Sequence, residues 1–248
     1  MEFYTTMSNS RFWLLFTGLF PVVVAQGIHT KRTTVRLPEA SGEPFGHSSQ
    51  NDSPALKLVV IGESTVSGVG VSHQQQGLAA QVAMALEQQL AKSVQWFAYG
   101  KNGARLADVC LTLLPQHLHQ ADIILVSIGV NDTTRLSSLK HWQQHLTVLV
   151  TKIRQHSNAP IRFLTLPPMH QFTALPSPLR QVVGFRARAL DVALRKSISQ
   201  FVDCAVIDYQ TPMKAHFLAE DGYHPSEVGY AVIGHDVAKA LAKEALTS

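Results

Sequence analysis

Apolar and polar positions follow two alternating patterns along the chain from residue 55 onward. Residues 56–61 form a short run that is apolar except for Lys57 and rich in valine, which is typical of a strand buried on both faces. Residues 77–91 instead repeat their apolar side chains at helical spacing, which predicts an amphipathic helix. The same two patterns predict further strands at 94–99, 122–128, 161–166 and 205–209, and further helices at 105–114, 139–155, 179–199 and 226–245.

This regular alternation of strand and helix predicts an α/β fold with a central parallel sheet of about five strands. Such a sheet is covered by helices on both faces, and its functional site lies at the carboxyl ends of the strands. Ser64, Gly103 and Asn131 each follow a predicted strand closely. We therefore expect these three residues to converge, although they are far apart in sequence.

The N-terminal region begins with an uncharged apolar run at residues 12–25, which is shorter than the roughly 20 residues that a membrane helix needs. It fits the apolar part of a signal peptide with a small residue, Ala25, before the cleavage point. It also fits a membrane anchor followed by basic residues, or a helix packed on the domain. The expected location is therefore membrane-associated or exported (periplasmic or secreted). Residues 38–54, rich in proline, serine and glycine, are interpreted as a linker.

These features divide the chain into residues 1–54, a leader or anchor with a linker, and residues 55–248, one globular domain. The length of 248 residues, with 46% hydrophobic and 15% charged residues, suits one well-buried domain. The net charge of +4 comes mostly from the N-terminal region and from the helix at 179–199. No aromatic residues alternate with these basic ones, so we predict no nucleic-acid partner.

Cysteines and histidines give no metal signal. Cys110 and Cys204 lie far apart in separate apolar stretches, which predicts buried free thiols and no disulfide framework. His141 and His145 are one helical turn apart but have no acidic residue nearby on that face. We predict neither a metal nor a cofactor.

The candidate chemistry comes from residues near the two ends of the domain. A serine becomes a nucleophile only when a base takes its proton, and a third group must orient that base. Ser64 follows the first predicted strand, and Asp221 precedes His224 by three residues within one loop. One nitrogen of the His224 ring can therefore bond Asp221 while the other faces Ser64.

Two further residues are candidates for stabilising negative charge on a reacting oxygen. The side-chain amide of Asn131 can donate a hydrogen bond to an oxyanion, an effect worth about 3 kcal/mol per donor in known enzymes. Gly103 can present its backbone N–H to the same oxygen. A phosphate-binding loop after Gly62 is excluded because the required Gly-Lys-Ser/Thr ending is absent. The α/β-hydrolase elbow is also excluded, since Val66 stands where its second glycine belongs.

Together these blocks resemble the SGNH hydrolases, also called the GDSL lipase/esterase family. The family's Ser, Gly, Asn and His match Ser64, Gly103, Asn131 and His224 in that order. The resemblance covers residues 56–245, and residues 25–40 look like a stretch that precedes the domain in some bacterial members. One departure is Glu63, which stands where the family usually has aspartate, and we expect it to rearrange the hydrogen bonds of that loop.

The resemblance implies a flavodoxin-like three-layer α/β/α sandwich and a metal-free serine hydrolase of the esterase or lipase type. Its substrate would be a small-molecule or lipid ester. By it, the catalytic residues are Ser64, Asp221 and His224, and the oxyanion hole is formed by Ser64, Gly103 and Asn131. Val130, Met169 and His170 are expected to border the substrate. Two alternatives stay open: a deacetylase or acyltransferase acting on glycan or cell-envelope substrates, and a non-catalytic binding module. Membrane association through residues 12–25 also stays open.

Overall fold

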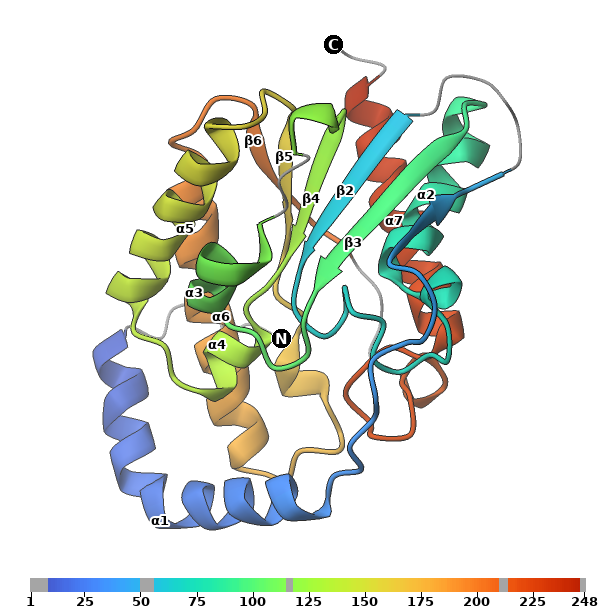
Figure 1. Cartoon of the computed structure of the whole chain (residues 1–248). Helices are drawn as coiled ribbons and strands as arrows, with labels where there is room; N and C mark the ends of the chain where they lie inside the picture. The colour runs from blue at the N-terminus through green and yellow to red at the C-terminus, as the bar shows by residue number, and fades with distance from the viewer. Residues whose placement is uncertain (1–8, 50–55, 115–117, 210–213, 246–248) are drawn as a thin grey trace.

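The central element of the fold is one mixed sheet. The computed structural model describes residues 9–49, 56–114, 118–209 and 214–245 (Figure 1). Within these residues, six strands pair in the order β1-β3-β2-β4-β5-β6, and only β1 runs antiparallel to its neighbour. The strands are β1 (Phe45–His47), β2 (Leu56–Gly62), β3 (Val94–Gly100), β4 (Ile123–Ser127), β5 (Ile161–Leu164) and β6 (Cys204–Ile207).

Helices cover both faces of this sheet (Figure 1). One face carries α2 (Leu78–Leu90) and α7 (Glu227–Ala245), and the other carries α3 (Leu106–Asp108), α5 (Leu139–Arg154) and α6 (Leu179–Ile198). Successive side chains of a strand point to opposite faces, so β2 serves two cores. Leu58 and Val60 pack with α2 and α7, whereas Val59 and Ile61 pack with the α5 and α6 side.

The predicted fold class is confirmed. The five parallel strands follow the flavodoxin-like order, in which the chain reverses direction across the sheet beside its central strand. That reversal lies between β2 and β4 here, and the crevice at their carboxyl ends is the usual ligand position in such sheets. The ten strands and helices expected from the sequence are all present, although the helix expected at 105–114 is split between α3 and a π-helical turn over Val109–Leu113.

Two elements were not predicted from the sequence. Helix α4 (Val130–Thr134) is too short to show a helical period. Strand β1 has only three residues and lies in the stretch interpreted as a linker, yet it pairs with β3 and extends the sheet. That part of residues 38–54 is therefore integral to the domain.

Helix α1 (Asn9–Thr33) contains the apolar run and bends near its middle, where Pro21 interrupts the helical hydrogen bonds (Figure 1). It packs against α6. Val23 is buried in the core, while Leu14, Phe20 and Ile28 are exposed. Within the described residues, none of the helices combines the length and the apolar character that crossing a bilayer requires. Export and membrane association stay predictions.

Strands β2 and β4 approach each other closely at Gly62, and a substitution there tests this contact. A Cβ atom on Gly62 would lie 1.9 Å from the carbonyl oxygen of Ser127 in the neighbouring strand. We expect Gly62→Ala to lower the free energy of unfolding by at least about 2 kcal/mol, because backbone must move to admit the methyl group. The measurement is urea denaturation followed by circular dichroism.

The matched control is Gly18→Ala in α1, where an added Cβ meets nothing within 4 Å. Alanine is the better helix former, so this variant should be as stable as the wild type or more stable by up to about 1 kcal/mol. Equal stability of Gly62→Ala and the wild type would contradict the close approach of the strands.

Candidate active site

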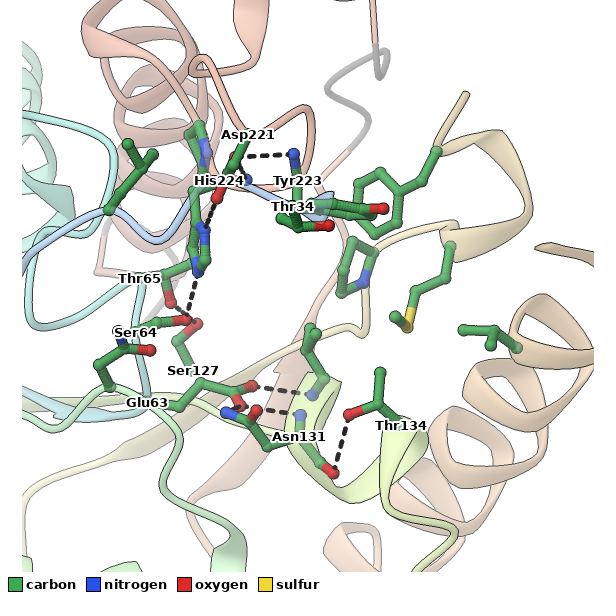
Figure 2. Close-up of a pocket in the computed structure, with 18 of the residues that line it drawn as sticks. Thr34, Glu63, Ser64, Thr65, Ser127, Asn131, Thr134, Asp221, Tyr223 and His224 are labelled. Atoms are coloured by element: carbon green, nitrogen blue, oxygen red, sulfur yellow. Dashed lines mark hydrogen bonds and ion pairs between the residues drawn. The ribbon is translucent and has the colours of Figure 1, made fainter. Parts of the chain in front are cut away.

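Ser64 lies in a tight turn at the carboxyl end of β2, the central strand. The N–H groups of Val66 and Ser67 both donate to the carbonyl oxygen of Glu63, at 2.9 and 3.1 Å, and so close the turn around Ser64. The Ser64 carbonyl accepts the N–H of Val69 at 3.0 Å. These bonds fix the backbone around Ser64, and its side chain points toward His224 (Figure 2).

His224 and Asp221 come from the loop that precedes α7. Figure 2 shows a line of contacts that runs from Asp221 through His224 to Ser64. His224 Nδ1 lies 2.6 Å from Asp221 Oδ2, and His224 Nε2 lies 2.9 Å from Ser64 Oγ. The other oxygen of Asp221 accepts the N–H groups of Tyr223 and His224. The structure thus brings together three side chains that the sequence only suggested were neighbours.

The charge of Asp221 sets the tautomer of the histidine. Burial by itself would raise the pKa of Asp221, but the hydrogen bonds from the His224 ring and from the Tyr223 N–H outweigh it and lower that pKa below its usual range. An ionised Asp221 only accepts hydrogen bonds, so Nδ1 of His224 must carry a proton. When the ring is neutral, Nε2 is left as an acceptor for the Ser64 hydroxyl proton.

The backbone N–H groups of Ser64 and Gly103 are open to a ligand. Within the described residues, neither the N–H of Ser64 nor that of Gly103 donates to any protein acceptor. Gly103 lies in the turn after β3 with φ at +78°, a conformation that strongly favours glycine. The arrangement can therefore bind an oxygen that carries negative charge.

Asn131, the third predicted donor, already has partners for both amide hydrogens. Its Nδ2 donates to Glu63 Oε2 at 2.5 Å and to the carbonyl oxygen of Ala104 at 3.1 Å. The carbonyl oxygen of Ala104 only accepts hydrogen bonds, so the Asn131 amide must turn its nitrogen toward it. For Asn131 to donate to a bound oxyanion, one of these two bonds must first break. The bond to Ala104 is the longer and therefore the weaker of the two.

Glu63 is the centre of this hydrogen-bond network. Its carboxylate is buried, and it accepts the backbone N–H groups of Val130 and Asn131 at 2.8 and 3.0 Å in addition to the Asn131 amide. The glutamate therefore links the turn after β2 to the first residues of α4. Burial raises the pKa of Glu63 to about 7, and the hydrogen bonds from Asn131 and Val130 only partly oppose that rise.

A cavity of about 680 Å³ opens beside Ser64 and His224. Its lining includes Val130 and Met169, which the sequence analysis proposed as substrate contacts. Many of the other lining side chains are apolar, among them Phe172 and Leu175 from the segment between β5 and α6, and Leu179, the first residue of α6.

His170 does not line this cavity and so differs from its predicted place. The short 3₁₀ turn over Met169–Gln171 points Met169 inward and leaves His170 exposed against Gly184 of α6. Sequence analysis also missed residues 27–37, which form one wall of the cavity, because nothing in their pattern signals a binding role.

The remaining predicted features concern metals and thiols. Within the described part of the chain, no group of three or more histidine, cysteine or acidic side chains has a metal-binding arrangement. Both cysteines are free thiols; Cys110 is buried as predicted, whereas Cys204 is only partly buried because it lies on edge strand β6.

Comparison with known proteins gives a consistent family assignment. The model of the GDSL-like Lipase/Acylhydrolase family matches residues 60–232. A GDSL-like esterase of Mycobacterium tuberculosis is 24% identical over 250 residues, which cover 94% of this chain and 79% of the relative.

Two solved structures show the same fold. The lipase Lip_vut3 from a goat rumen metagenome superimposes with a TM-score of 0.62 and 19% identity, covering 75% of this chain and 97% of its own. The psychrotrophic esterase EstA from Pseudoalteromonas sp., described as inhibited by monoethylphosphonate, has a TM-score of 0.60 and 16% identity, covering 78% of this chain and 100% of its own.

The raised pKa of Glu63 predicts a pH-dependent stability. Between its ordinary value of 4.5 and about 7, the folded chain holds a proton that the unfolded chain releases, so the free energy of unfolding must fall as the pH rises. We expect the stability difference between wild type and Glu63→Gln to shrink by about 2–3 kcal/mol from pH 5 to pH 8, measured by urea denaturation.

The control is Glu43→Gln, which changes an exposed glutamate that makes none of the hydrogen bonds of this network. Its stability difference from the wild type should not change over the same pH interval. A Glu63→Gln difference that is constant between pH 5 and pH 8 would show that the buried carboxyl keeps an ordinary pKa.

Proposed function

The chain belongs to the GDSL-like lipase/acylhydrolase family, and on that basis we propose that it hydrolyses carboxylic esters with Ser64 as nucleophile. Membership of an esterase and lipase family favours an enzyme over the binding module considered from the sequence. The observation that carries the proposal is the 2.9 Å contact between His224 Nε2 and Ser64 Oγ, two residues separated by 160 positions.

In the proposed first step, Ser64 Oγ attacks the carbonyl carbon of the ester while its proton passes to His224 Nε2. Asp221 keeps the ring in the required tautomer and stabilises the imidazolium that forms. His224 then gives the proton to the departing alcohol, and an acyl group stays on Ser64. A water molecule, deprotonated by the same ring, releases the acid in the second step.

The negative charge of the tetrahedral intermediate is held by the N–H groups of Ser64 and Gly103. Their lack of a protein acceptor within the described residues supports this role. Asn131 joins them by exchanging its 3.1 Å bond to Ala104 for the oxyanion, while its shorter bond to Glu63 keeps the amide in place.

The shape of the cavity supports an ester with an apolar acyl chain. Met169, Phe172 and Leu175 line the space next to Ser64, and such side chains gain by contact with alkyl groups rather than with a sugar. This apolar lining therefore favours carboxylic esters with an alkyl acyl chain over acetylated glycans.

Replacement of Ser64 tests the mechanism directly. We expect Ser64→Ala to lower kcat for p-nitrophenyl butyrate by at least about 10³-fold, because the nucleophile is removed. The variant should also lose covalent labelling by a fluorophosphonate probe, detected by intact-mass spectrometry.

The matched control is Ser72→Ala, an exposed serine in the same loop. Its turnover and its labelling should equal those of the wild type. Ester hydrolysis by Ser64→Ala at the wild-type rate, or an adduct on another residue, would contradict the proposed mechanism.

A further inference from the structure

The N-terminal strap, which we define as residues 26–41, precedes the region that the family model matches. The family model begins at residue 60, so the strap lies entirely before it. The mycobacterial relative aligns over 94% of this chain, and that alignment must include most of residues 1–59.

The strap is bonded at one end to the start of α6. Gln26 donates through Nε2 to the carbonyl oxygen of Ser177 at 2.7 Å and accepts the N–H of Leu179 at 3.0 Å. Further along, Thr34 contacts Tyr223 in the loop that carries Asp221 and His224 (Figure 2).

The other end of the strap reaches the loops on the opposite side of the site. Glu39 Oε1 accepts the N–H of Asn102, the neighbour of Gly103, at 2.6 Å. The N–H of Ala40 donates to the carbonyl oxygen of Ser67 at 3.0 Å, in the turn that holds Ser64. The strap thus connects four loops that surround the site.

Between these anchors the strap forms one wall of the cavity. The second half of α1 lies across the end of the sheet toward which the arrows of β2 and β3 point (Figure 1). Gly27, Thr30, Lys31 and Thr34 line the cavity, and their spacing of three or four residues places them on one helical face. Arg32 is exposed and is not part of this lining.

The rim of the cavity carries three cationic side chains, Lys31 and Arg36 from the strap and Arg135 from the end of α4. All three are exposed to solvent, and none of the ion pairs found among the described residues involves them. Arg135 reaches the oxyanion side, since its guanidinium lies 3.5 Å from the point where a Cβ on Gly103 would be.

The two carboxyl groups that line the same cavity do not balance these charges. Asp221 is bound to His224, and Glu63 is buried beneath Asn131 with all its contacts inside the protein. An anion at the rim therefore meets three positive groups and no exposed carboxylate of the described lining.

We propose that Lys31, Arg36 and Arg135 bind an anionic group of the ester substrate, so that the strap selects esters bearing a phosphate or carboxylate. This inference rests on the proposed ester hydrolysis. A charge-assisted hydrogen bond to such a group contributes more than a neutral one, and the cations also raise the local concentration of anionic substrate. The anion can belong to the alcohol or to the acyl part of the ester.

Two matched substrate pairs separate these sources. The first pair is 1-decanoylglycerol and 1-decanoylglycerol 3-phosphate, in which the anion is on the alcohol. The second is p-nitrophenyl butyrate and mono-p-nitrophenyl glutarate, in which the anion is on the acyl chain. The quantity measured is the ratio of kcat/KM for the anionic ester to that for its neutral partner, at a concentration below micelle formation.

We expect this ratio to exceed about ten in at least one pair for the full-length wild type. Lys31→Gln and Arg36→Gln should each lower it about three- to tenfold, through KM, because each removes one charged contact. The control is Arg32→Gln, which removes the same charge from the neighbouring exposed position outside the lining. Its ratio should equal that of the wild type.

A wild-type ratio near one in both pairs would overturn the inference. It would also be overturned if Arg32→Gln lowered the ratio as much as Lys31→Gln does, because that would indicate only a long-range effect of net charge. If the wild type hydrolysed no ester, the proposed function would fail instead. The inference is then decided by calorimetry with Ser64→Ala: decanoylglycerol phosphate must bind more tightly than decanoylglycerol, and adding Lys31→Gln must weaken that binding.

Discussion

The arrangement of the site depends on one buried carboxylate. Glu63 begins the turn after β2 and binds the first two N–H groups of α4, so the residue before Ser64 is attached directly to Asn131. This contact crosses the crevice at the reversal point of the sheet, between β2 and β4. The side chain of Glu63 accepts three hydrogen bonds from the first two residues of α4. It reaches α4 while β2 and β4 stay as close as Gly62 allows.

The fold could be predicted from the sequence because its signals are strong and local. Residues 58–61 of strand β2 form a continuous apolar run, and α5 repeats its buried residues at helical spacing, so each pattern has one physical interpretation. Helix α4 and strand β1 were missed since they have five and three residues and depend on tertiary contacts such as those of Glu63. The alternatives for residues 12–25 arose because length and apolarity do not reveal that α1 packs on α6.

Some residues of the site could be predicted from the sequence, whereas other contacts of the site have no sequence signal. Ser64, Asp221 and His224 were found because their chemistry needs fixed residue types in a recognisable order, and the structure places them in contact. The bond between Asn131 and Ala104 has no sequence signal, since any residue supplies a carbonyl oxygen. The strap likewise has no sequence signal. Lys31 and Arg32 are neighbouring cationic residues, and only the structure shows that Lys31 lines the cavity and Arg32 does not.

The separation of 160 residues between Ser64 and His224 has a consequence for biosynthesis. At about 5–20 residues per second, the ribosome needs roughly 8–30 seconds to add the histidine after the serine. Throughout that interval the nascent chain already carries its strap and its serine but lacks His224, which we propose as the base. Under the proposed mechanism, ester hydrolysis therefore cannot begin before translation has reached the loop that precedes α7.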